Sequence, residues 1–118
     1  GNSPKMTRGE LWWADLGLPF GSEPGFRRPI LILQNDAFTR SKLNTIIIAP
    51  FTTNLSLAAA PGNTLVKKRD SRLPADSVIN LSQIVTIDRL RLIEKVGKLN
   101  PAILKQVDEG IKLVLDLR

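Results

Sequence analysis

The chain has 118 residues, of which 42% are apolar, so it is long and hydrophobic enough for one folded domain with a single core. Its 17 basic and 11 acidic residues give a net charge of +6, which is compatible with a polyanionic partner or with a basic surface that has no specific ligand. Cysteine is absent, which excludes disulfides and thiolate zinc sites, and no apolar run approaches the roughly 20 residues that span a membrane. These features fit a cytoplasmic protein without a membrane partner. We take Gly1 to Lys5 as a cloning remnant, so that the expected domain covers residues 6–118.

The first half of the chain predicts three strands. Aromatic and apolar residues favour a strand over Arg8–Leu16, and the Gly- and Pro-rich segment Gly17–Phe26 is expected to be a loop. Two short apolar runs rich in β-branched residues, Arg28–Gln34 and Thr45–Ala49, predict buried strands. Asn35–Arg40 between them is expected to form a turn or one short helical turn.

The second half predicts shorter strands and more loop. Asn54–Asn63 is expected to be a loop, Thr64–Lys67 a short edge strand and Lys67–Arg72 a charged turn. Alternation of apolar and polar residues favours a strand over Ser77–Ile87, broken midway, and a further strand over Leu92–Leu99.

The chain is expected to end in a helix. Asn100 is a suitable N-cap, Pro101 suits the first helical position, and the apolar residues that follow recur at helical spacing. Gly110 inside this helix costs about 1 kcal/mol relative to Ala. Five or more strands followed by one helix predict an α+β fold, a small SH3-like curled antiparallel β-barrel packed by a C-terminal helix.

Two arginines lie where the Gly-bracketed loop meets the second strand. Pro29 disfavours the helical region for Arg28, which favours extended geometry there. A permanently charged guanidinium at the start of a strand is suited to bind a phosphate. The alternative is an ordinary solvated charge at a strand end. Arg27 would provide a general electrostatic contact or none.

Hydroxyl groups follow the third predicted strand. Thr52 and Thr53 should face opposite sides by the two-residue period, so that only one of them can point at a site. Thr52 could instead bond its own backbone, as strand threonines often do. Ser22 and Glu23 could contact a ligand or cap the loop, and Glu23 is a weak base at the ordinary glutamate pKa of about 4.3.

Adjacent tryptophans in the first strand should point to opposite faces of the sheet. We expect both Trp12 and Trp13 to pack, with base stacking or a dimer contact as the alternative role for one of them.

Several segments, in their order and spacing, together resemble one known family. The segments are RGELWWADL, GSEPGFRRPILILQND, TIIIAPFT, DSVINLSQIVTID and VDEGIKLVL. They resemble the MazF/PemK toxins of type II toxin–antitoxin modules over nearly the whole chain from Arg8 to Leu117. The resemblance implies the plasmid-maintenance-toxin fold, a homodimer, and metal-independent, cofactor-free endoribonuclease activity on short motifs in single-stranded RNA. It also implies a cognate antitoxin whose acidic tail occupies the RNA groove, and DNA binding together with that antitoxin.

The resemblance also assigns roles to individual residues. It implies that Arg28 is catalytic, that Thr52 is its catalytic partner and that Ser22 contacts RNA. Further RNA contacts are expected from Glu23, Arg27, Thr53 and Gln83. Some relatives carry an acidic residue immediately before the glutamine, and this chain has Ser82 there.

Cleavage of RNA without a metal can use the 2′-hydroxyl of the substrate as the nucleophile. Arg28 would stabilise the charge that develops on the phosphate, and Thr52 would orient the phosphate or the arginine. The requirement for the 2′-hydroxyl would select RNA over DNA. Two other functions stay open at this point: a toxin of the same fold that poisons a protein target such as a topoisomerase, and a basic nucleic-acid-binding module without catalysis.

Overall fold

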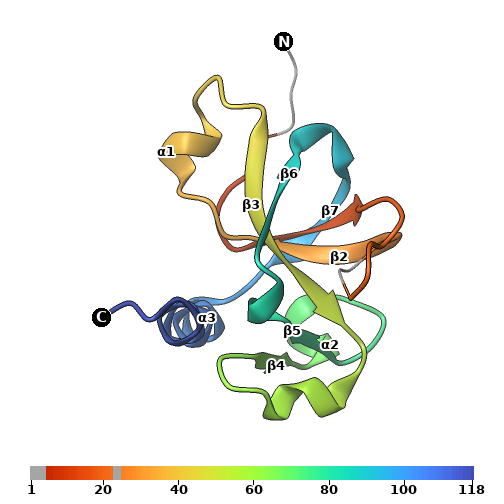
Figure 1. The fold of residues 1–118 in the computed structure, drawn as a ribbon, viewed down its shortest axis with the longest axis vertical. Coiled ribbons are helices and arrows are strands. Elements are labelled where there is room, and N and C mark those ends of the chain that lie inside the picture. Colours follow the sequence, from red (N-terminus) through yellow and green to blue (C-terminus); the bar gives the residue numbers. More distant parts are fainter. Residues whose placement is uncertain (1–4, 23–24) are drawn as a thin grey trace.

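The computed structural model describes residues 5–22 and 25–118. In this part of the chain, seven antiparallel strands form one curled sheet in the order β4-β5-β3-β2-β1-β7, with β6 paired to β3 (Figure 1). The strands are β1 (Glu10–Asp15), β2 (Arg27–Ile32), β3 (Thr45–Thr52), β4 (Thr64–Val66), β5 (Ser77–Ile79), β6 (Val85–Asp88) and β7 (Leu92–Lys98). The helices are α1 (Asp36–Thr39), α2 (Lys68–Ser71) and α3 (Pro101–Leu115), with 3-10 turns η1 (Leu55–Ala59), η2 (Leu81–Gln83) and η3 (Arg89–Arg91). The predicted α+β architecture with a curled sheet and a C-terminal helix is confirmed.

The curl of the sheet depends on β3, which changes partners along its length. Its first part pairs with β2 and β6, whereas its last residues, Phe51 and Thr52, pair with β5 (Figure 1). Pro50 lies at the change of partner, where it is opposite Ile30 and its carbonyl accepts the Asn80 N–H at 2.9 Å. Proline has no N–H with which to continue a ladder. The pairing of Phe51 and Thr52 with β5 extends the strand three residues beyond the predicted end at Ala49.

Both faces of the central strands are buried, against two separate clusters. Alternate side chains of β1, β2 and β3 point into one cluster or the other, as the two-residue period of a strand requires. The first cluster lies toward α3 and contains Leu11, Leu31, Leu33, Ala49, Phe51, Val66, Leu73, Ile79, Leu81, Leu99 and Val107. The second contains Met6, Trp12, Ala14, Ile30, Ile32, Ile46, Ile48 and Ile87.

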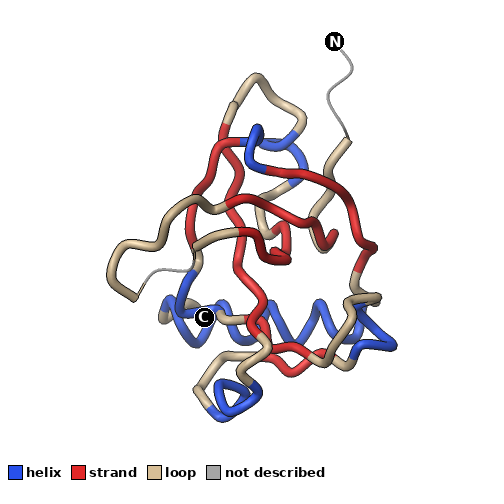
Figure 2. The backbone as a smooth tube through the Cα atoms, turned by 90° about the vertical axis from the view of Figure 1, so that its right-hand side faces the viewer, coloured by secondary structure: helices blue, strands red, loops and turns tan. Residues whose placement is uncertain are grey.

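Helix α3 lies across one side of the sheet, as Figure 2 shows. Its start is as predicted, because the Asn100 side chain accepts the Ile103 N–H at 2.9 Å and Pro101 occupies the first turn. Gly110 is buried on the inner face, where it meets the backbone of Gly62. No helix in the described ranges is both long and apolar enough to cross a lipid bilayer.

Two predicted irregular segments are helical, and those predictions were wrong. Within the predicted loop after β3, the Asn54 side chain accepts the Ser56 N–H at 3.2 Å and begins η1. The predicted charged turn forms α2, where the Asp76 carboxylate accepts the Lys68 N–H at 2.8 Å. That hydrogen bond, with a smaller contribution from the Lys67 charge, lowers the pKa of Asp76. In both segments a nearby side chain accepts a backbone N–H at the start of a short helix, where the sequence analysis expected a loop or a turn.

Other predicted elements are confirmed. The Ser77–Ile87 segment is broken by η2 into β5 and β6, and β4 lies at one edge of the sheet. The strand predicted over Leu92–Leu99 is β7, and the predicted first strand is shorter, as β1. The helical-turn alternative for Asn35–Arg40 is the one observed, as α1, with Asn35 as its cap.

Candidate functional site

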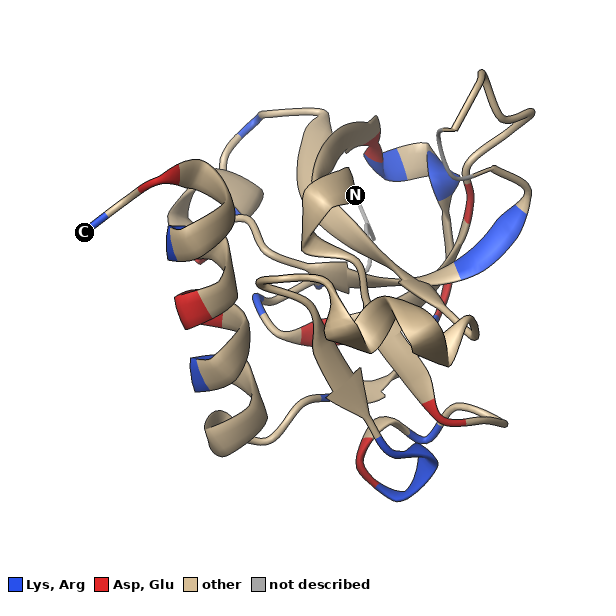
Figure 3. Ribbon diagram, turned by 60° about the horizontal axis from the view of Figure 1, so that its bottom comes forward, with Lys and Arg blue, Asp and Glu red and all other residues tan. Residues whose placement is uncertain are grey.

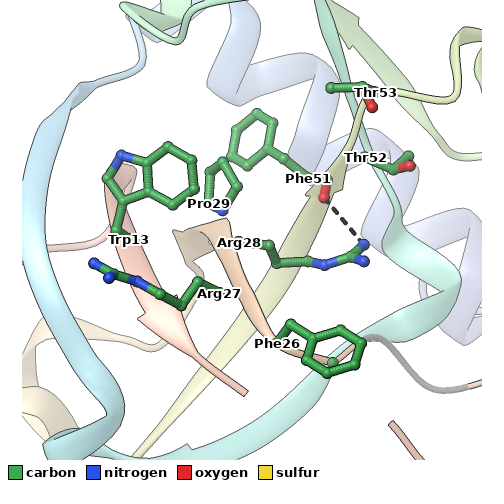
Figure 4. A pocket seen from close by; sticks show the side chains of 9 residues that line it. Trp13, Phe26, Arg27, Arg28, Pro29, Phe51, Thr52 and Thr53 are labelled. Carbon is green, nitrogen blue, oxygen red and sulfur yellow. Dashed lines mark hydrogen bonds between the residues drawn. The ribbon is translucent and has the colours of Figure 1, made fainter. Parts of the chain in front are cut away.

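A pocket of about 340 Å³ opens where β2 begins and β3 ends. The residues around it come from β1, from the end of the β1–β2 loop and from the two strand ends, as Figure 4 shows. They are Trp13, Gly25, Phe26, Arg27, Arg28, Pro29, Phe51, Thr52 and Thr53. The ladder between β2 and β3 runs from Ile32 opposite Ile48 to Ile30 opposite Pro50. Beyond Pro50 the end of β3 pairs with β5, and the pocket lies between the two strand ends.

Arg28 is half-buried in this pocket and its guanidinium has few partners. Its Nη1 donates to the Phe51 carbonyl at 3.5 Å, at the limit for a hydrogen bond (Figure 4). Its Nε is shielded from solvent and finds no acceptor within the described ranges, and no carboxylate of those ranges forms an ion pair with the side chain. A buried donor without a partner costs free energy, and in a pocket it indicates a group available to an anionic ligand.

Arg27 and Trp13 form the opposite side of the pocket. The Arg27 side chain is exposed and extends away from Arg28, to the side of the pocket on which Trp13 lies (Figure 4). Trp13 is half-buried and packs against the first core cluster, whereas Trp12 is 5% exposed in the second. The prediction that the two tryptophans face opposite sides and both pack is confirmed, and Trp13 additionally reaches the pocket.

Both threonines at the end of β3 line the pocket, so the prediction that only one of them could face a site was wrong. The two-residue period ends with the strand, and β3 ends at Thr52. Thr53 therefore has no strand geometry that would turn it to the other side. The Thr52 Oγ1 accepts the Asn54 N–H at 3.2 Å, which is the local backbone bond considered as its alternative role.

The other predicted site residues lie apart from this lining. Ser22 is exposed on the β1–β2 loop, and Glu23 lies outside the described residues. Gln83 is half-buried at the end of η2 and is not among the pocket residues given above. Ser82 is exposed and its hydroxyl donates to Asn80 Oδ1 at 2.7 Å. The pocket therefore brings together Arg27, Arg28, Thr52 and Thr53 but not Ser22 or Gln83.

Phe26 is the lining residue that the sequence analysis missed. The residue is 61% exposed and its backbone has φ +58°, a left-handed conformation that bulky residues rarely adopt. An aromatic residue between Gly and two arginines gives no sequence signal for a positive φ, so Phe26 was treated only as the end of the loop.

A second polar group lies on β1 outside the pocket. The Glu10 carboxylate, 4% exposed, accepts hydrogen bonds from Thr7 Oγ1 at 2.8 Å and Trp12 Nε1 at 3.0 Å, and pairs with Lys95 Nζ at 3.1 Å. Burial alone would raise the pKa of Glu10, but these three donors outweigh burial and hold the pKa below its ordinary value. Glu10 is therefore an ionised structural group in the native protein.

Charge is unevenly distributed around the fold. Figure 3 shows basic residues where β2 begins, next to the pocket, and charges of both signs along the outer face of α3. Within the described ranges, no three His, Cys, Asp or Glu side chains gather closely enough to hold a metal ion. The pocket thus offers cationic and hydroxyl groups suited to a phosphate.

Comparisons with known proteins identify the family of this chain. Residues 7–115 match the PemK-like, MazF-like toxin of type II toxin–antitoxin systems. The chain is 45% identical over 112 residues to endoribonuclease MazF2 of Mycobacterium bovis and to endoribonuclease MazF6 of Mycobacterium tuberculosis, covering 95% of this chain and 98% of each relative.

Solved structures have the same fold at lower sequence identity. A mycobacterial endoribonuclease in complex with its cognate antitoxin superposes with a TM-score of 0.77 at 22% identity, covering 98% of each chain. MazF from Deinococcus radiodurans superposes with a TM-score of 0.80 at 21% identity, covering 98% of this chain and 100% of that one. The sequence match over nearly the whole chain shows that this protein belongs to the PemK-like, MazF-like toxins of type II toxin–antitoxin systems.

Proposed function

We propose that this toxin is an endoribonuclease that cuts single-stranded RNA at short sequence motifs, without a metal or other cofactor. The observation that carries the proposal is the Arg28 guanidinium, which lies in a pocket with an unpartnered Nε and one long hydrogen bond to a carbonyl. The names of the mycobacterial relatives at 45% identity, both endoribonucleases, support the same activity.

In the proposed reaction the RNA supplies its own nucleophile. The 2′-oxygen attacks the adjacent phosphorus, the bond from phosphorus to the 5′-oxygen breaks, and the products are a 2′,3′-cyclic phosphate and a 5′-hydroxyl. The 2′-hydroxyl loses its proton to solvent and the leaving 5′-oxygen takes one up. Negative charge grows on the phosphate oxygens during attack, and Arg28 would stabilise it with a fixed positive charge and paired N–H donors. Arginine itself is a poor general base because its guanidinium stays protonated in proteins.

Thr52 would act beside Arg28 as the second catalytic group. Ile30 with Pro50 is the last pair of the β2–β3 ladder, and Arg28 and Thr52 each follow two residues beyond it, at the two strand ends that line the pocket. A phosphate bound between the two strand ends would be within reach of both side chains. Arg27 and Thr53, which line the same pocket, would bind neighbouring parts of the strand, and we assign RNA contacts also to Ser22, Glu23 and Gln83.

The proposal extends to partners and location. We propose a cytoplasmic homodimer inhibited by an acidic segment of a cognate antitoxin that competes with RNA for the basic surface. The net charge of +6 and the antitoxin complex of the structurally similar mycobacterial endoribonuclease support this part. Light scattering of the purified protein tests the homodimer directly.

The central experiment incubates the purified protein with a defined RNA in EDTA and maps the new ends. We expect cutting to persist in EDTA and to stop when the scissile nucleotide carries a 2′-deoxy sugar. Arg28→Ala should lose roughly 10²- to 10³-fold in rate, as for removal of one transition-state donor. Its matched control, Arg27→Ala, removes the neighbouring charge and should lose much less.

Each alternative function predicts a different result. A nucleic-acid-binding module would bind the RNA and leave it intact, and a topoisomerase poison would stop growth without new RNA ends. Equal losses in folded Arg27→Ala and Arg28→Ala would remove the special role of Arg28. Loss of all cutting in EDTA would refute the metal-independent mechanism.

A further inference from the structure

Phe26 is exposed and conformationally strained at the edge of the pocket. A residue with a β-carbon rarely adopts a φ of +58°, and Gly is the usual choice at such a position. Packing compensates little for this strain, because Phe26 is 61% exposed. Strain of this kind persists where the surrounding structure enforces it, and it is found most often at functional sites.

The surrounding backbone holds Phe26 in this conformation. Its N–H donates to the Gly17 carbonyl at 2.5 Å and its carbonyl accepts the Leu16 N–H at 2.9 Å, which closes the base of the β1–β2 loop. The next residue begins β2. The ring is thus fixed at its backbone to the rigid sheet.

The orientation of the ring places it beside Arg28. Figure 4 shows the Phe26 ring and the Arg28 side chain extending to the same side of β2, whereas Arg27 extends to the other side. Phe26 and Arg28 line the same pocket. A phosphate bound at Arg28 would therefore have an exposed aromatic face next to it.

We propose that Phe26 is a base-stacking residue, which binds the base of a nucleotide adjacent to the phosphate held by Arg28 and thereby positions the strand for cleavage. This inference rests on the proposed endoribonuclease function. Unpaired bases stack on aromatic side chains with little sequence preference, because every base has a π-face. The conformation of Phe26 is set before RNA binds, so little ordering of the backbone is needed on binding.

The test combines variants of Phe26 with single abasic sites in the RNA. Phe26→Gly should melt no lower than the wild type, because Gly accommodates a positive φ, yet its kcat/KM should fall roughly 5- to 100-fold, as for loss of one stacking aromatic. Phe26→Tyr should restore cutting and Phe26→Leu should not, because only Tyr keeps a planar ring. Phe38→Ala is the matched control, since Phe38 is 60% exposed but lies on α1, away from the pocket.

The abasic scan provides a readout that a structural role for Phe26 would not change. In the wild type, removing one particular base should reduce kcat/KM by the same factor as Phe26→Gly, and in Phe26→Gly that removal should have no further effect. The all-2′-deoxy oligonucleotide, which lacks the nucleophile, gives the same comparison through its Kd. This Kd comparison tests stacking even if the wild type cuts no RNA. A wild type that cuts no RNA would refute the endoribonuclease proposal separately.

Several results would overturn the inference. The first is that Phe26→Gly cuts RNA at the rate of the wild type, and the second is that this variant melts at a lower temperature. The third is that the wild type and the variant respond equally to every abasic site. Normal cutting by Phe26→Gly together with loss of inhibition by an acidic antitoxin peptide would show that the ring contacts the protein partner instead.

Discussion

Replacing Gly110 by alanine should destabilise the protein, although alanine is the better helix former. Gly110 lies on the buried face of α3, and a β-carbon added there would lie 2.2 Å from the Gly62 carbonyl oxygen and 2.6 Å from Leu81 Cδ1. Gly62 has φ +89°, so that residue is itself held in a conformation that favours glycine. The helix and the loop before β4 therefore approach each other through two glycines.

The size of the effect follows from two opposing contributions. Helix propensity favours Ala over Gly by about 1 kcal/mol. Relieving the contact requires the helix or the loop to move by about 1 Å before ordinary van der Waals distances are reached. Such overpacking costs about 1–3 kcal/mol in a well-packed core, and the upper half of that range applies here because one of the obstructing atoms belongs to the backbone. The expected net loss is about 1–2 kcal/mol.

Thermal unfolding of Gly110→Ala measures this loss. For a domain of this length, 1 kcal/mol corresponds to about 4 °C, so the melting temperature should fall by about 4–8 °C. Gln106→Ala, an exposed substitution in the same helix, is the matched control and should change stability by less than about 0.5 kcal/mol. A higher melting temperature for Gly110→Ala would show that helix propensity dominates and that α3 does not pack against Gly62 as described.

Three further predictions concern the polar groups and the charge. The pKa of Glu10 in the folded protein is below its value of about 4.3 in the unfolded chain. The ionised Glu10 carboxylate should therefore stabilise the fold fully at pH values above about 4.3, and this stabilisation should be lost as the pH falls through the folded pKa. Glu10→Gln should therefore cost about 1–3 kcal/mol at pH 7 but much less at pH 3, measured by urea unfolding at both pH values, and a pH-independent difference would contradict this assignment. Asn100→Ala should cost about 1 kcal/mol in the same assay through loss of the α3 N-cap, while Asn100→Gly should cost only a few tenths, and equal losses would argue against capping. Binding of single-stranded RNA should weaken with salt, and the plot of log binding constant against log salt concentration should have a slope of about −0.7 per phosphate neutralised. Arg27→Ala should neutralise one phosphate fewer, so its slope should be less steep by about 0.7. An unchanged slope would show that Arg27 does not contact the RNA.

Hydrophobic pattern and terminal signals predicted most of the fold. The buried strands β2 and β3 followed from short apolar runs, and the start of α3 followed from Asn100 and Pro101, because these signals are local and strong. The predictions failed where a helix begins with a hydrogen bond to a side chain several residues away in the sequence. Asp76, for example, accepts the Lys68 N–H at the start of α2. Short helices of this kind depend on such single contacts and leave little periodicity in the sequence.

The prediction of the pocket was less complete for a different reason. The neighbours of Arg28 in sequence made it a candidate, and its catalytic role stays a prediction from the family resemblance. The positive φ of Phe26 and the approach of Gly110 to Gly62 depend on contacts between segments that are separated in the sequence. For Gly110, helix propensity alone predicts that alanine would stabilise the helix, whereas the approach of Gly62 predicts the opposite sign. Residues whose conformation is enforced by tertiary contacts are the ones that sequence reasoning misses most easily.

The relation between Arg28 and Thr52 depends on the packing of the core more than on either residue. Both sides of β2 and β3 are buried, so shifting their register by one residue would exchange the sets of side chains that face the two clusters. The cost of that exchange fixes Ile30 opposite Pro50, and this last β2–β3 pair determines where Arg28 and Thr52 lie along the two strand ends, at the point where β3 leaves β2 for β5. A shift of one residue would displace Thr52 by one position along β3 relative to Arg28. Substitutions that weaken the packing of Ile30 or Ile48 should therefore reduce RNA cleavage before they unfold the protein, because the packing of the core sets the positions of the pocket residues.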